Sequence, residues 1–216
     1  ESFMRNKDVV FVGACDVRKD RLDQFAKKSG VKMVVGDYRR ILESKDVDGV
    51  LITTPDHWHS PMMVQAIQAG KDVYVEKPVS NAIEPALKMV EAAANSKQVV
   101  QVGCQQRSWQ HFQDWSKRVR EGYLGNINHC VLLFGGGGGG MARAPEQPQA
   151  PPPELDWEAF QGPAPRKPFV PSRLNWRGWW DYGGGSITDW GVHLTDVMLW
   201  YMNADKKAPL LTSASA

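Results

Sequence analysis

The sequence predicts an α/β fold with a doubly wound parallel sheet, followed by an incomplete α+β domain with an open, mainly antiparallel sheet. In the first half, short apolar runs rich in β-branched residues alternate with helical patterns. Strands that are apolar throughout are typical of a parallel sheet covered by helices on both faces. The alternation stops near Gly122, so we expect one domain over residues 1–122 and a second over residues 123–216. Only one strand is predicted in the second domain, and a single strand is unstable alone.

The first domain is predicted to contain five short strands separated by helices. The strands span Val9–Cys15, Val31–Val35, Gly49–Thr53, Val73–Val75 and Val99–Gly103. The helices span Arg18–Lys28, Pro61–Ala69, Asn81–Asn95 and Trp109–Glu121. We expect Ser60 to cap the second helix and Pro61 to take its first position, which suits a residue without a backbone N–H.

The second half shows three different patterns. Asn128–Phe134 resembles a strand, and the six glycines Gly135–Gly140 that follow it carry no functional inference. The proline-rich stretch Ala144–Pro171 is expected to lack regular structure. Ile187–Tyr201 has apolar residues every three or four positions, which predicts a helix with one core stripe. The stripe consists of Ile187, Trp190, Leu194, Val197, Met198 and Tyr201.

The composition argues against several kinds of partner. The chain is 42% hydrophobic and 23% charged, as is usual for a soluble globular protein. Its formal net charge of +2, without a basic run, argues against a nucleic-acid partner. No stretch approaches the roughly 18 apolar residues of a membrane span. The sequence leaves the location open between the cytoplasm and, where a signal peptide has been removed, the periplasm.

The three cysteines do not form a recognisable site. Cys15, Cys104 and Cys130 are scattered and lack the spacing of metal ligands or redox pairs. Each lies in an apolar, strand-like context, so we expect small core residues and no disulfide framework.

Asp16 directly follows the first predicted strand and precedes a helix. In a dinucleotide-binding fold, an acid at this place accepts hydrogen bonds from the adenosine ribose, although Asp is equally favoured as a helix N-cap. The glycine-rich phosphate loop lies about 20 residues before such an acid. Only fifteen residues precede Asp16, and their one glycine, Gly13, lies inside the predicted strand. We therefore expect this chain to lack the first strand of such a fold and its phosphate loop.

Two further motifs end neighbouring strands at the edge where open parallel sheets bind ligands. The first is Thr53–His59, whose two histidines lack a third metal ligand at suitable spacing, so no metal is expected. It could equally be a polar loop that caps the next helix. The second is Glu76-Lys77-Pro78. Proline favours an extended backbone at Lys77, so its ammonium could stabilise charge on a substrate oxygen, or it could be an ordinary surface lysine.

The late helix carries three titratable side chains on one face. Asp189, His193 and Asp196 fall within about 60° of each other at 100° per residue. The glycines Gly183–Gly185 precede them and allow a close approach of backbone or ligand. This face could form part of a site, or it could be solvated.

Taken in order, these motifs resemble the two signatures of the Gfo/Idh/MocA oxidoreductase family. The matching segments are Thr54–His59, Ala69–Lys71, Glu76–Pro78 and Gly183–Asp196. The resemblance implies a Rossmann domain that binds NAD or NADP, then a domain whose open sheet often forms a homo-oligomer interface.

The resemblance also implies roles for individual residues. Asp16 matches the ribose-binding acid, and the matching rim of the cofactor and substrate site consists of Thr54, Pro55, His59 and Glu76. Lys77 would lie beside the nicotinamide and bind the reacting hydroxyl. Asp189 would position the substrate, and His193 would be the general acid/base. NAD is favoured because the Asp16 carboxylate would repel a 2′-phosphate.

The expected activity is therefore hydride transfer to or from a sugar, polyol or related hydroxyl carbon. Two alternatives remain open. One is an NAD-dependent glycoside hydrolase that works by oxidation and elimination, which the tryptophan-rich segment Trp157–Trp190 would suit. The other is a non-catalytic binding protein on the same fold.

Overall fold

The computed structural model describes residues 3–133, 146–207, 209–211 and 213. The strands within these residues pair in parallel, which confirms the predicted α/β class. They are β1 (Gly13–Cys15), β2 (Met33–Val35), β3 (Gly49–Ile52), β4 (Asp72–Glu76) and β5 (Val100–Gly103). Four of them are shorter than predicted, because only part of each predicted segment has ladder partners on a neighbouring strand.

The strands form two separate pieces of sheet. One piece contains β1 and β2, and the other has the order β3-β4-β5. A doubly wound dinucleotide-binding sheet has the order 3-2-1-4-5-6. In that order, β1 and β2 correspond to strands 2 and 3, and β3, β4 and β5 correspond to strands 4, 5 and 6. The absence of a first strand stays a prediction.

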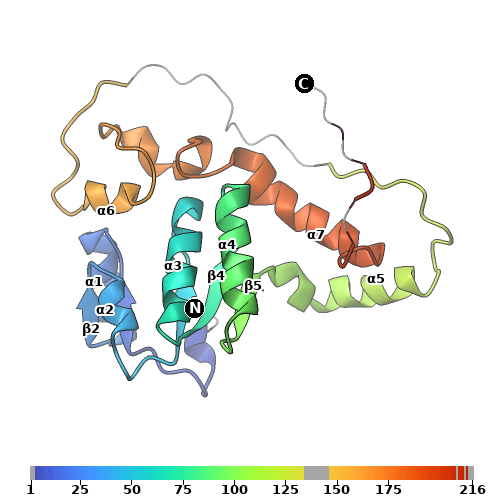
Figure 1. Ribbon diagram of the computed structural model, residues 1–216, viewed down its shortest axis with the longest axis horizontal. Helices are drawn as coiled ribbons and strands as arrows, with labels where there is room; N and C mark the ends of the chain where they lie inside the picture. Colours follow the sequence, from blue (N-terminus) through green and yellow to red (C-terminus); the bar gives the residue numbers. More distant parts are fainter. Residues whose placement is uncertain (1–2, 134–145, 208, 212, 214–216) are drawn as a thin grey trace.

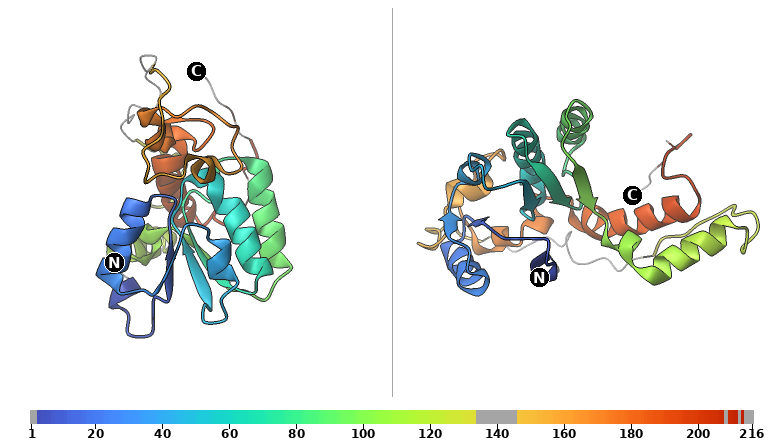
Figure 2. Two further views of the ribbon diagram at one scale, coloured as in Figure 1. Left: turned by 90° about the vertical axis from the view of Figure 1, so that its left-hand side faces the viewer. Right: turned by 90° about the horizontal axis from the view of Figure 1, so that it is seen from below.

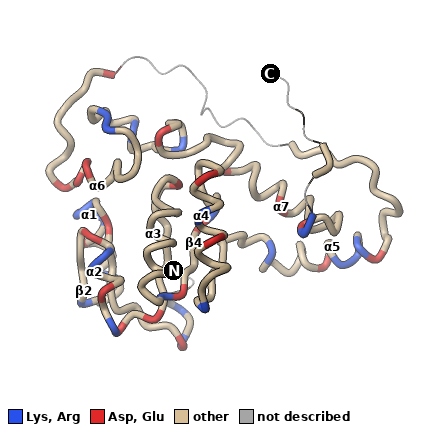
Figure 3. Tube along the Cα trace, in the orientation of Figure 1, with Lys and Arg blue, Asp and Glu red and all other residues tan. Residues whose placement is uncertain are grey.

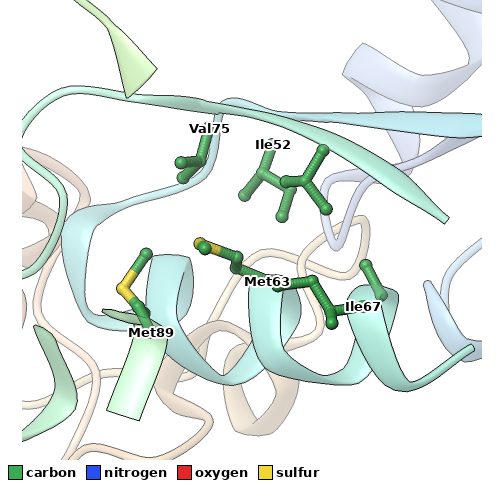
Figure 4. Packing of buried hydrophobic residues seen from close by; sticks show 7 residues of the cluster. Ile52, Met63, Ile67, Val75 and Met89 are labelled. Carbon is green, nitrogen blue, oxygen red and sulfur yellow. The ribbon is translucent and has the colours of Figure 1, made fainter. Parts of the chain in front are cut away.

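Helices cover the sheet pieces and extend beyond them (Figure 1). The helices of the first half are α1 (Lys19–Ser29), α2 (Arg39–Leu42), α3 (Asp56–Gln68), α4 (Ile83–Ala94) and α5 (Gln110–Arg120). Helices α3 and α4 pack side by side against β4 and its neighbours. The main core lies between them and the strands. In it, Ile52 of β3 and Val75 of β4 face Met63 of α3 and Met89 of α4 (Figure 4).

Helix α3 begins at Asp56, five residues before the predicted start, and Pro61 lies inside it. The prediction that Pro61 opens the helix and Ser60 caps it is therefore wrong. Pro61 removes one helical hydrogen bond, but tertiary contacts hold the added turn. The His57 N–H donates to the Tyr182 carbonyl over 3.3 Å, and the His59 side chain is only 1% exposed.

The second half is less regular than the first. It contains α6 (Trp157–Gln161), a π-helical turn (Ile187–Gly191) and α7 (Val192–Tyr201). Helix α6 lies inside the proline-rich stretch, which was expected to lack regular structure. It forms because no proline falls between Pro153 and Pro163, and because the Asp156 side chain caps it by accepting from the Ala159 N–H at 2.9 Å.

The predicted second sheet is absent from the described residues, where Asn128–Leu133 form no strand. Phe134 and the glycine run Gly135–Gly140 lie outside the described residues. The predicted core stripe of the late helix is also wrong, because Ile187 and Trp190 are 69% and 57% exposed. No sheet among the described residues covers this stripe. Instead, α7 packs beside α5, and both extend away from the parallel strands (Figure 2). Homo-oligomerisation through a second-domain sheet therefore stays a prediction.

A segment of the second half crosses back over the first domain. This covering segment, residues 149–182, contains a mainly aromatic hydrophobic cluster of Leu155, Trp157, Phe160, Phe169 and Tyr182. Its backbone joins the start of α1, since the Lys19 N–H donates to the Glu154 carbonyl at 2.8 Å. The Asp156 N–H donates to the Val17 carbonyl at 3.0 Å. The covering segment therefore lies over the carboxyl end of β1.

Charge and surface properties agree with the composition. Acidic and basic residues are interspersed along the described chain (Figure 3). None of the helices in the described ranges has the length and apolar character that a membrane crossing requires. Cys15 and Cys104 are half-buried free thiols, whereas Cys130 is exposed. The prediction of a core position is therefore wrong for Cys130, whose predicted strand does not form.

Candidate active site

Lys77 follows β4 directly, and its ammonium is held by one residue of the late π-helical turn. The Nζ donates to the Asp189 carboxylate at 2.7 Å and to the Asp189 backbone carbonyl at 2.8 Å. The side chains are 15% and 21% exposed, so water only partly screens the pair. The Lys77–Pro78 peptide bond is cis. Lys77 is thus not an ordinary surface lysine.

Asp189 is shared between two cations, and the second of them was not predicted from the sequence. The Arg177 Nε lies 3.1 Å from the Asp189 carboxylate, and its guanidinium stacks on the Trp176 ring at 4.3 Å. Burial alone would raise the pKa of Asp189, but hydrogen bonds from Lys77 and Arg177 outweigh burial and hold the pKa below its usual range. Arg177 was missed because it lies in a 3-10 turn of three residues, Trp176–Gly178, which is too short to show a periodic pattern in the sequence.

His193 lies one turn after Asp189 and is 5% exposed. Its Nδ1 is buried and has no hydrogen-bond partner among the described residues. Burial, followed by the positive charge of Lys77, lowers the pKa of His193 below its usual value. The imidazole is therefore neutral at pH 7, the state that a general base requires.

The predicted shared face of the late helix divides into two parts. Asp189 and His193 lie with Lys77, whereas Asp196 binds Arg107, which follows β5. The Arg107 Nε donates to both Asp196 oxygens at 3.0 and 2.8 Å, and its Nη2 donates at 2.8 Å. The Arg107 guanidinium also lies 5.3 Å from the centre of the Trp200 ring. Asp196 therefore anchors α7, and the face is neither entirely solvated nor entirely part of the site.

Asp16 lies at the carboxyl end of β1, as predicted. One of its carboxylate oxygens accepts from the Arg18 N–H at 2.8 Å, in a turn that leads into α1. The residue that caps the helix is Arg18, so Asp16 is not the N-cap. Its second oxygen has no hydrogen-bond partner in the described ranges, and the position remains suitable for a ribose hydroxyl.

Thr54, Pro55 and Glu76 lie at the carboxyl ends of β3 and β4. The Thr54 hydroxyl is buried without a partner among the described residues, and Pro55 precedes α3 as its N-cap in extended conformation. Glu76 is half-buried opposite Gly103, where an added Cβ would lie 3.0 Å from the Glu76 carboxylate. A side chain at Gly103 would therefore displace Glu76 from this edge.

His59 lies behind the edge. Its Nδ1 is 2.7 Å from the Pro78 carbonyl and its Nε2 is 2.9 Å from the Thr54 carbonyl. The ring thereby joins the end of β3 to the peptide after Lys77. His57 points elsewhere, with its Nε2 2.9 Å from the Phe160 carbonyl. The two histidines do not converge, and the described residues contain no cluster that could hold a metal ion.

Several buried polar atoms at this edge and beneath the covering segment have no hydrogen-bond partner among the described residues. Buried polar groups are normally hydrogen-bonded, so each exception calls for an explanation. The atoms without a partner in the described part of the chain include Thr54 Oγ1, Asp56 Oδ1, His57 Nδ1, Tyr182 Oη and His193 Nδ1. Their residues come from the start of α3, from the covering segment and from α7. Buried water commonly supplies the missing partners of such atoms.

Two sequence profiles of one oxidoreductase family match the chain. The profile of the NAD-binding Rossmann-fold domain matches residues 1–104, and the profile of the C-terminal alpha/beta domain matches residues 140–216. The chain belongs to the Gfo/Idh/MocA family. The predicted family and its Rossmann fold are thereby confirmed.

Curated relatives in this family have different chemistries. The chain is 28% identical over 118 residues to a myo-inositol 2-dehydrogenase of Thermotoga maritima. The aligned region covers 55% of this chain and 35% of that protein. It is 30% identical over 106 residues to a glycosyl hydrolase family 109 protein of a Shewanella species, covering 45% of this chain and 23% of that protein. The chain thus spans about a third or less of the length of these relatives.

A solved structure from the family supports the fold over most of the chain. An oxidoreductase domain protein from Kribbella flavida has a TM-score of 0.64 and 24% identity. The likeness covers 88% of this chain and 44% of that one. At this identity the likeness shows the fold alone, and the chemistry depends on the side chains described above.

Proposed function

We propose that this protein transfers a hydride between NAD and a hydroxyl-bearing carbon of a cyclic polyol or sugar. The single observation that carries the proposal is the ammonium of Lys77, held at the sheet edge by Asp189 beside a buried, neutral His193. The similarity to a myo-inositol 2-dehydrogenase makes an inositol the substrate class of choice. NADP is less favoured, because Asp16 would repel its 2′-phosphate.

The residues of this chain fit the two ends of the cofactor. Asp16 would bind the adenosine ribose, and the unpaired hydroxyl of Thr54 would lie at the nicotinamide end. Pro55 and Glu76 would complete the rim, and His59 would support it from behind by orienting Thr54 and Pro78. Gly13 is the only glycine among residues 1–15, and we assign residues of this chain only to the two ends of the cofactor.

The proposed chemistry divides the work between three side chains. Bound at this edge, NAD would supply the acceptor for the hydride of the hydroxyl-bearing carbon. Nε2 of neutral His193 takes the hydroxyl proton, which requires that Nδ1 carries the ring proton. Lys77 stabilises the negative charge that develops on the substrate oxygen. Asp189 holds the Lys77 ammonium in place, and it remains ionised because two cations face it.

The test is turnover of myo-inositol with NAD, followed by NADH absorbance, in the wild type and in His193→Ala. We expect the variant to lose roughly 10²–10⁴-fold in turnover, the usual contribution of general acid–base catalysis. His129→Ala is the matched control, because His129 is exposed and distant in sequence from the site. Full activity of His193→Ala would remove His193 from the mechanism.

A glycoside hydrolase that uses NAD without net consumption is a second candidate. Two observations favour it, namely the similarity to a family 109 glycosyl hydrolase and the exposed rings of Trp180 and Trp190. These side chains are 89% and 57% exposed, and Trp190 lies edge-on to the His193 ring at 6.2 Å. Such rings could stack on a sugar. Release of aglycone from an aryl glycoside without net NADH would favour this candidate, whereas NADH accumulation favours the dehydrogenase.

A further inference from the structure

Asp56 is a buried acid that the sequence did not single out and that the proposed chemistry does not use. It is the first residue of α3 and is 2% exposed. Its Oδ1 is buried without a hydrogen-bond partner in the described ranges. A carboxylate in this state is costly, because burial removes water and no donor replaces it. The burial of the Asp56 carboxyl therefore calls for a functional explanation.

The surroundings of Asp56 place it against the site. A Cβ added to Gly183 would lie 3.3 Å from the Asp56 Oδ2 and 3.1 Å from the Trp176 ring, so Gly183 allows Asp56 and Trp176 to pack closely. Three charged groups act on Asp56. They are Arg177 after Trp176, Asp189 of the π-helical turn and Lys77 after β4. These are the same three groups that form the ion-pair cluster, with Asp189 between the two cations.

We propose that Asp56 is a positioning residue that sets the net charge of the Lys77–Asp189–Arg177 cluster by holding or releasing one proton. Because its Oδ1 is out of contact with solvent, Asp56 acts through the cluster and does not bind the substrate through that atom. The geometry supports this role independently of the reaction. The catalytic consequence rests on the proposed function of Lys77.

The two protonation states differ in a simple way. When Asp56 is a neutral acid, the two cations and the Asp189 carboxylate leave one positive charge beside the substrate, which would stabilise a developing alkoxide. When the Asp56 carboxyl releases its proton to solvent, the carboxylate cancels that charge. Burial raises the pKa of Asp56 to about 7, with Arg177 opposing the rise, Asp189 adding to it and Lys77 opposing it. Asp56 would therefore change between its protonated and ionised forms near neutral pH.

The test is a carboxyl titration by NMR of protein labelled with ¹³C at the aspartate side chains. Asp56→Asn and Asp189→Asn assign the two resonances of interest. We expect one carboxyl to titrate near pH 7 and to be missing in Asp56→Asn. We also expect the Asp189 resonance to shift over the same pH range in the wild type but not in Asp56→Asn. Titration of every aspartate below about pH 5, the usual range of the residue, would overturn the proposal, as would an Asp189 signal without a shift near pH 7.

Unfolding by urea provides a second readout that does not depend on activity. A folded-state pKa above the unfolded value favours the protonated native state, so this contribution to stability is lost as pH rises from about 4 through 7. Asp56→Asn cannot ionise, and its stability should therefore rise relative to the wild type between pH 5 and pH 8. Asp23→Asn is the matched control, because Asp23 is an exposed acid on α1. Parallel curves for Asp56→Asn and the wild type would contradict the proposal.

The pH profile of activity separates this inference from the proposed function. If myo-inositol is oxidised, the ratio of wild-type to Asp56→Asn kcat/KM should fall at least threefold between pH 6 and pH 8.5. A merely structural Asp56 would leave the ratio constant across pH, and that result would overturn the positioning role. If no inositol is oxidised by either protein, the proposed substrate fails, while the NMR titration still decides the proton and the coupling to Asp189.

Discussion

Lys77 and Asp189 lie 112 positions apart in the sequence, yet the ammonium of Lys77 binds both the carboxylate and the backbone carbonyl of Asp189. This double contact joins the end of β4 to the turn that leads into α7. It holds the two halves of the chain together at the point where the proposed chemistry takes place. The contact also orients the Asp189 backbone, which places His193 one turn later.

Lys77→Met should reduce both stability and hydride transfer. Hydrogen bonds to charged groups contribute about 1.5–3 kcal/mol, and the remaining Arg177 contact offsets part of that loss. We therefore expect a decrease of about 1–2 kcal/mol in the free energy of unfolding, measured with urea. Lys19→Met removes an exposed pair with Asp23 and should change stability by less than about 0.5 kcal/mol. Equal stability of the two variants would mean that the Lys77 contact is screened like a surface pair.

Arg107→Lys should weaken the anchor of α7 although the charge is kept. A lysine cannot reproduce the forked contact of Arg107 with both Asp196 oxygens. The Arg107 side chain is 35% exposed, so water moderates the effect, and we expect a loss of about 0.5–1 kcal/mol. Hydrogen exchange of the α7 amides should increase together with this loss. Unchanged protection of α7 would show that its packing against α5 is sufficient.

Gly162→Ala should displace the covering segment from α3. A Cβ at this position would lie 2.0 Å from the Trp58 ring, and Gly162 has a φ of +49°, which L side chains rarely adopt. We expect a loss of about 1–3 kcal/mol on unfolding by urea. In a double-mutant cycle with Trp58→Ala, the combined loss should be smaller than the sum of the single losses, because the clash requires the ring. Additive losses would attribute the effect to the backbone alone.

Buried His193 should make the protein sensitive to acid. Burial and Lys77 lower its folded-state pKa, so the unfolded chain binds more protons once the pH falls below about 6.5. The stability contributed by neutral His193 is therefore present above that pH and is lost as the pH falls towards the folded value. Wild-type stability should decrease relative to His193→Gln between about pH 7.5 and pH 5.5. His129→Gln, at an exposed position, should show no such trend.

The local sequence pattern was sufficient to predict most helices and strands of the first domain. Alternation of β-branched runs with helical segments predicted the strands and most of the helices. Predictions were wrong where tertiary contacts outweigh local preference. Pro61 predicted a later start for α3, but His57 and His59 are held by Tyr182, Thr54 and Pro78. The apolar stripe of the late helix predicted burial that no described sheet provides.

The sequence by itself determined the family, the parallel sheet and the candidate residues Lys77, Asp189 and His193, because order and spacing along the chain carry that information. Only the tertiary structure decided which side chains meet. It paired Arg177 with Asp189 and Asp196 with Arg107, and it left the Oδ1 of Asp56 buried without a hydrogen-bond partner among the described residues. The physical reason is that pairing, burial and charge depend on distances between residues far apart in the chain, and no local pattern records those distances.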